Sequence, residues 1–213
     1  DELLKAPAVP HPGGQRRDVT VLMADLCAFT ALAEQQPPEA VLETLNAYLE
    51  ALAGPVLEAG GTLDKYLGDG VMAIFGAPLG DPNHARKALV CAREMWRRVE
   101  ALNRARRARG LPVLDVRAGV HSGEAVLGNI GTPQRMDYTA IGDAVNVCSR
   151  LQTEAAPGEI LVTRQALQAA GGLFPGPAEV VGPEPVAIRG RRDRVEAFRV
   201  RPSALSDRDL RVV

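Results

Sequence analysis

The chain has 213 residues and a formal net charge of −1, and 46% of its residues are hydrophobic. Its length allows one sizeable domain with tails, and its balanced charge gives no electrostatic reason to expect a nucleic acid or an anionic membrane as a partner. No apolar run approaches the roughly 20 residues that cross a bilayer, so no membrane segment is expected. Cys27, Cys91 and Cys148 are scattered without metal-type spacing, which favours reduced thiols in a cytoplasmic protein. Because the chain begins at Asp1 rather than at Met, we expect a fragment of a longer protein, with a regulatory domain outside it.

The first third of the chain reads as a linker, a strand and a helix. Residues 1–17 are rich in proline and glycine, which is a linker composition. An apolar strand is predicted over Val19–Ala24, directly before Asp25. The Pro37–Pro38 pair fits the start of a helix, and apolar residues then recur at helical spacing until Gly60–Gly61 ends it.

A hairpin is predicted next, over Leu63–Gly76. Gly68–Gly70 is its turn signal, and Val71–Phe75 is an apolar run suited to a buried strand. Two strands thus each deliver one aspartate, Asp25 and Asp69, at the edge of a sheet. Converging carboxylates suit a hard divalent cation such as Mg²⁺, which is usually held together with substrate phosphates. The residues alone therefore predict a divalent-metal site.

The remaining elements alternate between helices and strands. A long helix is predicted from Asp81–Pro82 to about Arg109, with an arginine-rich face that we interpret as solvated. Strands are expected over Val113–Val120 and Glu124–Ile130, with His121–Gly123 as the turn between them. The rest is expected as an extended segment over Tyr138–Ile141, a helix from Gly142–Asp143, a strand over Ile160–Thr163, a helix over Arg164–Ala170, two or three strands within 177–200 and a tail over 201–213.

This order predicts an α+β fold. We expect a ferredoxin-like βαββαβ core, with an antiparallel sheet covered by helices and a C-terminal strand extension. The sequence has neither a Gly-x-Gly-x-x-Gly turn after a strand nor a Gly-x-x-x-x-Gly-Lys-Ser/Thr loop. A nucleotide, if one binds, is therefore not held by a P-loop.

Four stretches, in order and with fitting intervals, resemble the catalytic domain of class III nucleotidyl cyclases, the adenylyl and guanylyl cyclases. They are Val21–Thr30, Lys65–Phe75, Val116–Gly123 and Arg135–Leu151. The resemblance implies a catalytic domain over 18–200. The family makes a cyclic nucleotide and pyrophosphate by attack of the ribose 3′-hydroxyl on the α-phosphate of a nucleoside triphosphate, with two metal ions at the attacking and leaving oxygens.

The resemblance also implies roles for phosphate and metal ligands. Asp25 and Asp69 match the two aspartates that bind two Mg²⁺ or Mn²⁺ ions, although strand-end aspartates can also simply cap turns. Asn146 matches the residue that orients the ribose, and Arg150 the residue that stabilises charge on the transferring phosphoryl group. Arg117 matches another phosphate-contacting arginine.

Arg191 falls near the position where many members have a lysine for the triphosphate tail, within a run of arginines that allows several registers.

The resemblance assigns base recognition to Lys65 and Thr139. A lysine only donates hydrogen bonds, which suits adenine N1, and a hydroxyl can accept from the adenine amino group. Guanylyl cyclases usually carry Glu at the lysine position, and many bacterial-type adenylyl cyclases carry Thr at the second. ATP is therefore the expected substrate. A guanylyl cyclase, or a non-catalytic cyclase-like sensor or dimerisation module, is the alternative.

In this family the metal aspartates come from one subunit, and the lysine, threonine, asparagine and arginine come from the other. This chain carries both sets, which implies a head-to-tail homodimer with two equivalent shared sites. A monomer would be inactive, and dimer geometry would be the natural control point.

Overall fold

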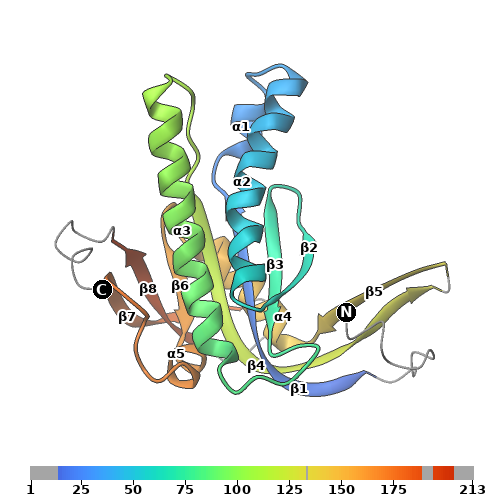
Figure 1. Cartoon of the computed structure of the whole chain (residues 1–213). Helices are drawn as coiled ribbons and strands as arrows, with labels where there is room; N and C mark the ends of the chain where they lie inside the picture. The colour runs from blue at the N-terminus through green and yellow to red at the C-terminus, as the bar shows by residue number, and fades with distance from the viewer. Residues whose placement is uncertain (1–13, 133, 189–193, 204–213) are drawn as a thin grey trace.

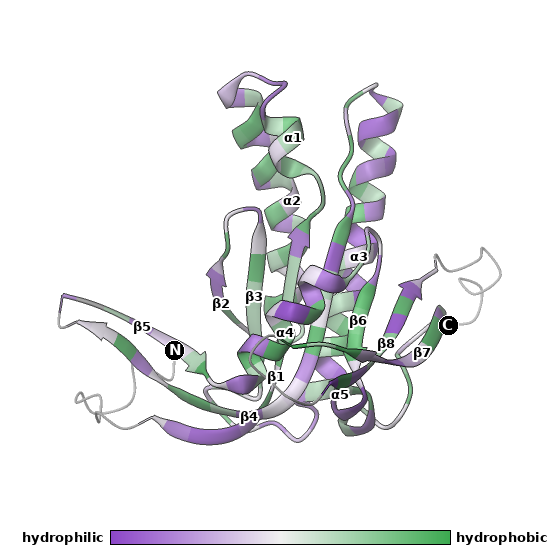
Figure 2. Ribbon diagram, turned by 180° about the vertical axis from the view of Figure 1, so that it is seen from behind, coloured by the Kyte–Doolittle hydropathy of each residue, from purple (hydrophilic) through white to green (hydrophobic). Residues whose placement is uncertain are grey.

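The computed structural model describes residues 14–132, 134–188 and 194–203. These residues form one eight-stranded sheet with helices on both of its faces (Figure 1, Figure 2). The elements are, in chain order, β1 (Gln15–Leu26), α1 (Phe29–Ala33), α2 (Pro38–Glu58), β2 (Thr62–Tyr66), β3 (Gly70–Phe75), α3 (His84–Ala108), β4 (Val116–Thr132), β5 (Arg135–Ile141), α4 (Asp143–Glu154), β6 (Ile160–Thr163), α5 (Arg164–Ala169), β7 (Ala178–Val186) and β8 (Val195–Pro202).

The strand order confirms the predicted α+β architecture. The strands lie in the order β2-β3-β1-β4-β6-β8-β7, and β5 pairs with β4 outside this path. The first four are antiparallel neighbours in the order of a ferredoxin-like βαββαβ unit. β6, β8 and β7 form the C-terminal extension. The sheet is not purely antiparallel, because β6 returns through α4 and pairs with β4 in parallel.

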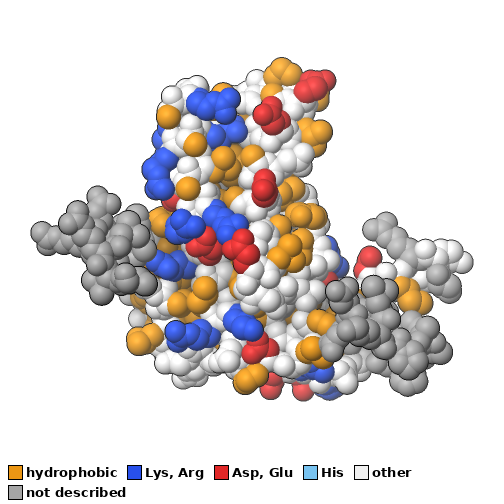
Figure 3. Space-filling model, in the orientation of Figure 1, with side chains coloured by type: hydrophobic (Ala, Val, Ile, Leu, Met, Phe, Trp, Pro, Cys, Tyr) orange, Lys and Arg blue, Asp and Glu red, His pale blue; other side chains and the backbone are white. Residues whose placement is uncertain are grey.

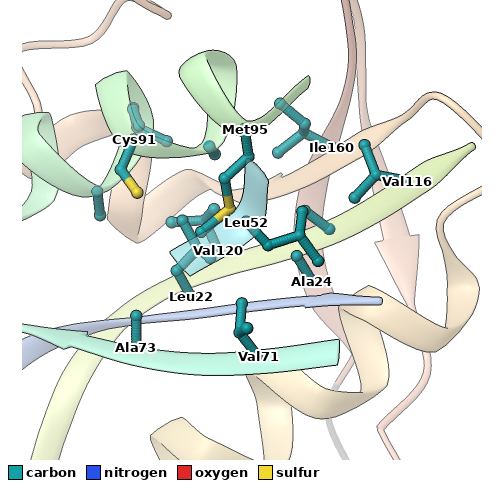
Figure 4. Close-up of a cluster of buried hydrophobic side chains, with 14 of the residues drawn as sticks. Leu22, Ala24, Leu52, Val71, Ala73, Cys91, Met95, Val116, Val120 and Ile160 are labelled. Atoms are coloured by element: carbon teal, nitrogen blue, oxygen red, sulfur yellow. The ribbon is translucent and has the colours of Figure 1, made fainter. Parts of the chain in front are cut away.

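The two faces of the sheet carry separate apolar clusters, because successive side chains of a strand point to opposite faces. Leu22 and Ala24 of β1 pack under α2 and α3 in the cluster of Figure 4. Met23 lies on the opposite face, in a cluster that includes Cys148 of α4. Figure 2 shows α4 on this second face. Asp25 follows Met23 by two residues, so its side chain leaves the sheet on the α4 side.

The predicted turn at His121–Gly123 is wrong, because β4 continues through it and pairs with β1 without a break in register. His121 and Ser122 are buried. The hydroxyl oxygens of Ser122 and Thr20 are 2.6 Å apart, and Nδ1 of His121 lies 3.0 Å from Oγ1 of Thr163. Polar side chains with such partners can be buried inside a sheet.

The sheet extends beyond the predicted 18–200 boundaries at both ends. Gln15–Arg17, expected in the linker, continue β1 because they pair with β4. The guanidinium of Arg17 donates to the carbonyl of Pro78 at 2.7 Å, which holds this end of the strand. Arg201 and Pro202, expected in the tail, continue β8 opposite β7.

The surface of α3 is basic, as its sequence predicts. Arg104, Arg107 and Arg109 are exposed, and Figure 3 shows Lys and Arg side chains along this helix. Among the residues that the structure describes, no helix has the length and apolarity needed to cross a membrane.

Candidate active site

The end of β1 and the turn between β2 and β3 bring Asp25 and Asp69 close together. Asp25 lies opposite Gly70 in the register of β1 and β3, and Asp69 directly precedes Gly70. The two backbones approach so closely that a Cβ atom on Gly70 would lie 2.9 Å from the Cβ of Asp25 and 2.5 Å from the carbonyl oxygen of Ala24. A glycine at this position therefore allows the hairpin to carry Asp69 to the end of β1.

The electrostatics of this carboxylate pair favour a cation. Burial raises the pKa of the Asp69 carboxyl above its usual value, and the negative charge of Asp25 raises it as well, while a backbone hydrogen bond and Arg117 oppose the rise. Two acidic groups that disfavour each other's charge are stabilised by a positive ion. No third His, Cys, Asp or Glu joins them among the described residues. Such an oxygen-only donor set fits Mg²⁺ or Mn²⁺, which complete their coordination with water and substrate phosphates.

Arg117 lies directly beside Asp25 on the neighbouring strand. Its Nε donates to Oδ1 of Asp25 at 2.8 Å and its Nη2 to Oδ2 at 3.1 Å, so the guanidinium forms a bidentate ion pair with the carboxylate. This hydrogen bonding raises the pKa of Arg117. Its Nη1 also donates to the carbonyl of Thr153 at 3.1 Å, which connects the Asp25–Asp69 pair to α4.

Cys27 follows Asp25 by two residues and is a free thiol. Burial raises the pKa of its thiol to about 11. The thiol is therefore protonated at neutral pH and is a poor metal ligand.

Lys65 and Thr139 meet at a residue that the sequence reasoning missed, Asp64. The hydroxyl of Thr139 donates to Oδ2 of Asp64 at 2.8 Å, and Nζ of Lys65 lies 3.4 Å from the same oxygen. The Asp64 side chain is fully buried, and Thr139 is 7% exposed. β5 reaches this position by folding over the α4 side of the sheet, where Ala140 shares a cluster with Met72 of β3. An aspartate inside a predicted strand, where this residue type is rare, was the signal that could have identified Asp64.

Asn146 and Arg150 lie four residues apart on α4 and line the same cavity of about 500 Å³. The other lining residues are Ser149, Thr153 and Ile188. Nη2 of Arg150 contacts Oε1 of Glu154 at 2.6 Å, and both side chains are partly exposed. The helix sits tightly on β4, because a Cβ atom on Gly119 would lie 2.6 Å from the carbonyl oxygen of Cys148.

The structure therefore gathers the predicted residues into three groups. Asp25, Asp69 and Arg117 form the first, Lys65 and Thr139 the second, and the two α4 residues the third. Thr153 adjoins both the first and the third group, because its carbonyl accepts from Arg117 while the residue lines the α4 cavity. Arg191 lies outside the described residues.

A ferredoxin-like sheet with this C-terminal extension is the fold of the class III nucleotidyl cyclase catalytic domain. Residues 13–201 match the family described as "Adenylate and Guanylate cyclase catalytic domain", and the chain belongs to this family.

Named relatives fall on both the adenylyl and the guanylyl side of the family. "Adenylate cyclase 1" of Rhizobium meliloti (strain 1021) is 41% identical over 145 residues, which cover 67% of this chain and 22% of that protein. The solved adenylyl cyclase CyaB from P. aeruginosa is 33% identical with a TM-score of 0.81, covering 92% of this chain and 97% of that one. The solved guanylyl cyclase Cya2 is 34% identical with the same TM-score, covering 90% and 95%. The chain thus spans less than a quarter of the length of the Rhizobium relative.

Proposed function

We propose that this chain is a catalytic domain that converts ATP into cyclic AMP and pyrophosphate. The observation that carries the proposal is the meeting of Lys65 and Thr139 at one buried carboxylate, although the two residues are far apart in the sequence. A lysine ammonium beside a hydroxyl matches the edge of adenine, where the N1 acceptor lies next to the amino donor. The Rhizobium relative, named as an adenylate cyclase, supports the same substrate.

In this proposal Asp25 and Asp69 hold two Mg²⁺ or Mn²⁺ ions. When bound, the ions supply Lewis-acid stabilisation of the attacking 3′-oxygen and the leaving pyrophosphate. Asn146 orients the ribose through its amide, and Arg117 and Arg150 bind phosphate oxygens and stabilise charge that builds during transfer. Both arginines are ion-paired here, with Asp25 and with Glu154. In the proposal, phosphate oxygens accept from their remaining N–H groups or replace these carboxylates.

The proposal includes a homodimer in which each site takes Asp25 and Asp69 from one subunit and Lys65, Thr139, Asn146 and Arg150 from its partner. Apolar side chains are exposed in two places that could form the interface, namely the β2–β3 hairpin and the β4–β5 arm, which projects from the body in Figure 1. Exposed apolar patches of this kind mark interaction surfaces. The residues are Tyr66, Leu67, Ile130, Met136 and Ile141.

The test is product formation by the purified chain, with ATP and GTP in parallel, with Mg²⁺ and with Mn²⁺, over a range of protein concentrations. Cyclic AMP from ATP, rising faster than linearly with protein concentration, would support both the substrate and the dimeric site. Cyclic GMP as the main product would overturn the ATP assignment. No product from either nucleotide at high protein concentration would favour the non-catalytic alternative.

A further inference from the structure

Asp64 occupies an irregular position in its strand. In the register of β2 and β3, Leu63 lies opposite Ala73 and Lys65 lies opposite Met72, so Asp64 is an extra residue without a partner of its own. This is a β-bulge, a feature that changes the direction of a side chain. Neighbouring residues of a regular strand point to opposite faces, but here Nζ of Lys65 lies only 3.4 Å from Oδ2 of Asp64. The bulge thus brings both side chains to the same side.

The hydrogen bond between Asp64 and Thr139 has a fixed direction. A carboxylate can only accept, and a threonine hydroxyl has a single hydrogen. The hydrogen of Thr139 is therefore directed at Oδ2 of Asp64, 2.8 Å away. Only the lone pairs of the hydroxyl remain for a ligand. Lys65, with three hydrogens on its ammonium, keeps donors available while it contacts Asp64.

We propose that Asp64 is a positioning residue that sets the base specificity of the site, by turning Thr139 into an obligate hydrogen-bond acceptor beside the donor Lys65. This inference rests on the proposed binding of the base at these two residues. Adenine offers an amino donor to Thr139 and the N1 acceptor to Lys65, so both contacts are satisfied. Guanine offers the O6 acceptor and an N1–H donor at the same two positions. Both contacts then fail, with lone pairs facing lone pairs and hydrogens facing hydrogens.

The second oxygen of Asp64 indicates that the residue is not there for stability alone. Oδ1 is buried and has no hydrogen-bond partner among the described residues. A buried acceptor without a partner lowers the stability of the fold. An asparagine has nearly the same shape, can still accept from Thr139 and carries no buried charge. We therefore expect Asp64→Asn to fold, with a melting temperature equal to or above that of the parent chain.

The test compares kcat/KM for ATP and for GTP in the purified chain and in Asp64→Asn. The amide can present either its oxygen or its nitrogen to Thr139, so the hydroxyl becomes free to donate to guanine O6. We expect the ATP-to-GTP ratio of kcat/KM to fall about 10–100-fold, the range of one hydrogen-bond mismatch. Asp81→Asn is the matched control, because Asp81 also pairs with a lysine, Lys87, at 2.6 Å, but does not contact Thr139. The ATP-to-GTP ratio of Asp81→Asn should equal that of the parent chain.

A double-mutant cycle separates positioning from general damage. Thr139→Val removes the hydroxyl, so Asp64→Asn should have no further effect on the ratio in a Thr139→Val background. Thr139→Ser keeps the hydroxyl and should keep most of the preference for ATP. A folded Asp64→Asn variant with an unchanged ratio, or with equal losses for both nucleotides, would overturn the role of Asp64. Preference of the parent chain for GTP would instead overturn the proposed substrate.

Discussion

Asp69 stays in an environment that disfavours its own charge. Burial and the nearby Asp25 raise its pKa, and the tight contact at Gly70 keeps the two carboxylates together. If Asp69 served only the fold, a neutral side chain at this position would make the fold more stable. This destabilisation is consistent with the proposed cation site, because a bound cation would offset it.

We expect Asp69→Asn to raise the melting temperature in metal-free buffer at neutral pH while it abolishes product formation. An amide has no charge to lose on burial and no repulsion from Asp25. The increase in melting temperature should become smaller as the pH falls below the pKa of Asp69, because a protonated carboxyl in the parent chain has no buried charge. Thermal melts at pH 7 and at acid pH measure this difference. Asp115→Asn, at an exposed aspartate, is the control and should change neither property; a less stable Asp69→Asn variant at pH 7 would contradict the argument.

A buried glutamate, Glu159, connects the C-terminal strands β6 and β8. Glu159 directly precedes β6, and its side chain is 2% exposed. It accepts from the backbone of Ala156 and from Arg199 and Arg201 of β8. Burial alone would raise the pKa of Glu159, but these hydrogen bonds and charges outweigh it and lower the pKa below its usual value. Glu159 therefore stabilises the β6–β8 junction when it is ionised.

We expect Glu159→Gln to cost about 1–3 kcal/mol of unfolding free energy at pH 7, because two arginines lose a charged acceptor in a buried position. A carboxyl with a lowered pKa contributes stability above its unfolded pKa and loses it as the pH falls through its folded pKa. Denaturant titrations should therefore show that the difference in unfolding free energy between Glu159→Gln and the parent chain becomes smaller below about pH 4. Glu196→Gln, in the exposed pair with Arg164, should cost less than about 1 kcal/mol. Equal losses of unfolding free energy in Glu159→Gln and Glu196→Gln would contradict the argument that burial makes the Glu159 contacts stronger.

Local patterns predicted most elements, and contacts between distant segments account for what they missed. Helical spacing identified α2 and α3, and turn chemistry placed Asp69 at the tip of its hairpin. The His121–Gly123 stretch resembles a turn, and only its pairing with β1 and the distant Thr20 and Thr163 explain why it is a buried strand. Asp64 was missed for the same reason, because its role depends on a bulge and on Thr139 in another strand.

Each chain carries both halves of the proposed shared site. Heterodimers of two differently damaged chains can then contain one intact site. We expect Asp69→Ala and Asn146→Ala each to be nearly inactive alone, and a 1:1 mixture to recover roughly a quarter of the parent activity if subunits pair at random. Product formation before and after mixing measures the recovery.

The matched control is a mixture of Asp69→Ala with Asp25→Ala. Both residues belong to the metal half, so every site in that mixture lacks one aspartate and activity should stay absent. No recovery in the first mixture, with heterodimers demonstrated by differently tagged chains, would refute the shared site.

The bulge in β2 also constrains the order in which this domain could evolve a preference for GTP. Lys65→Glu, the exchange that guanylyl cyclases would suggest, puts a second negative charge next to the buried carboxylate of Asp64. Removing the bulge instead would shift the register of β2 and turn its side chains to the wrong faces. If the chain acts on ATP as proposed, a descendant that changes to GTP therefore has to replace Asp64 before, or together with, Lys65. With the proposed base contacts, substitution paths that begin at Lys65 would pass through an intermediate that is less stable and matches neither base.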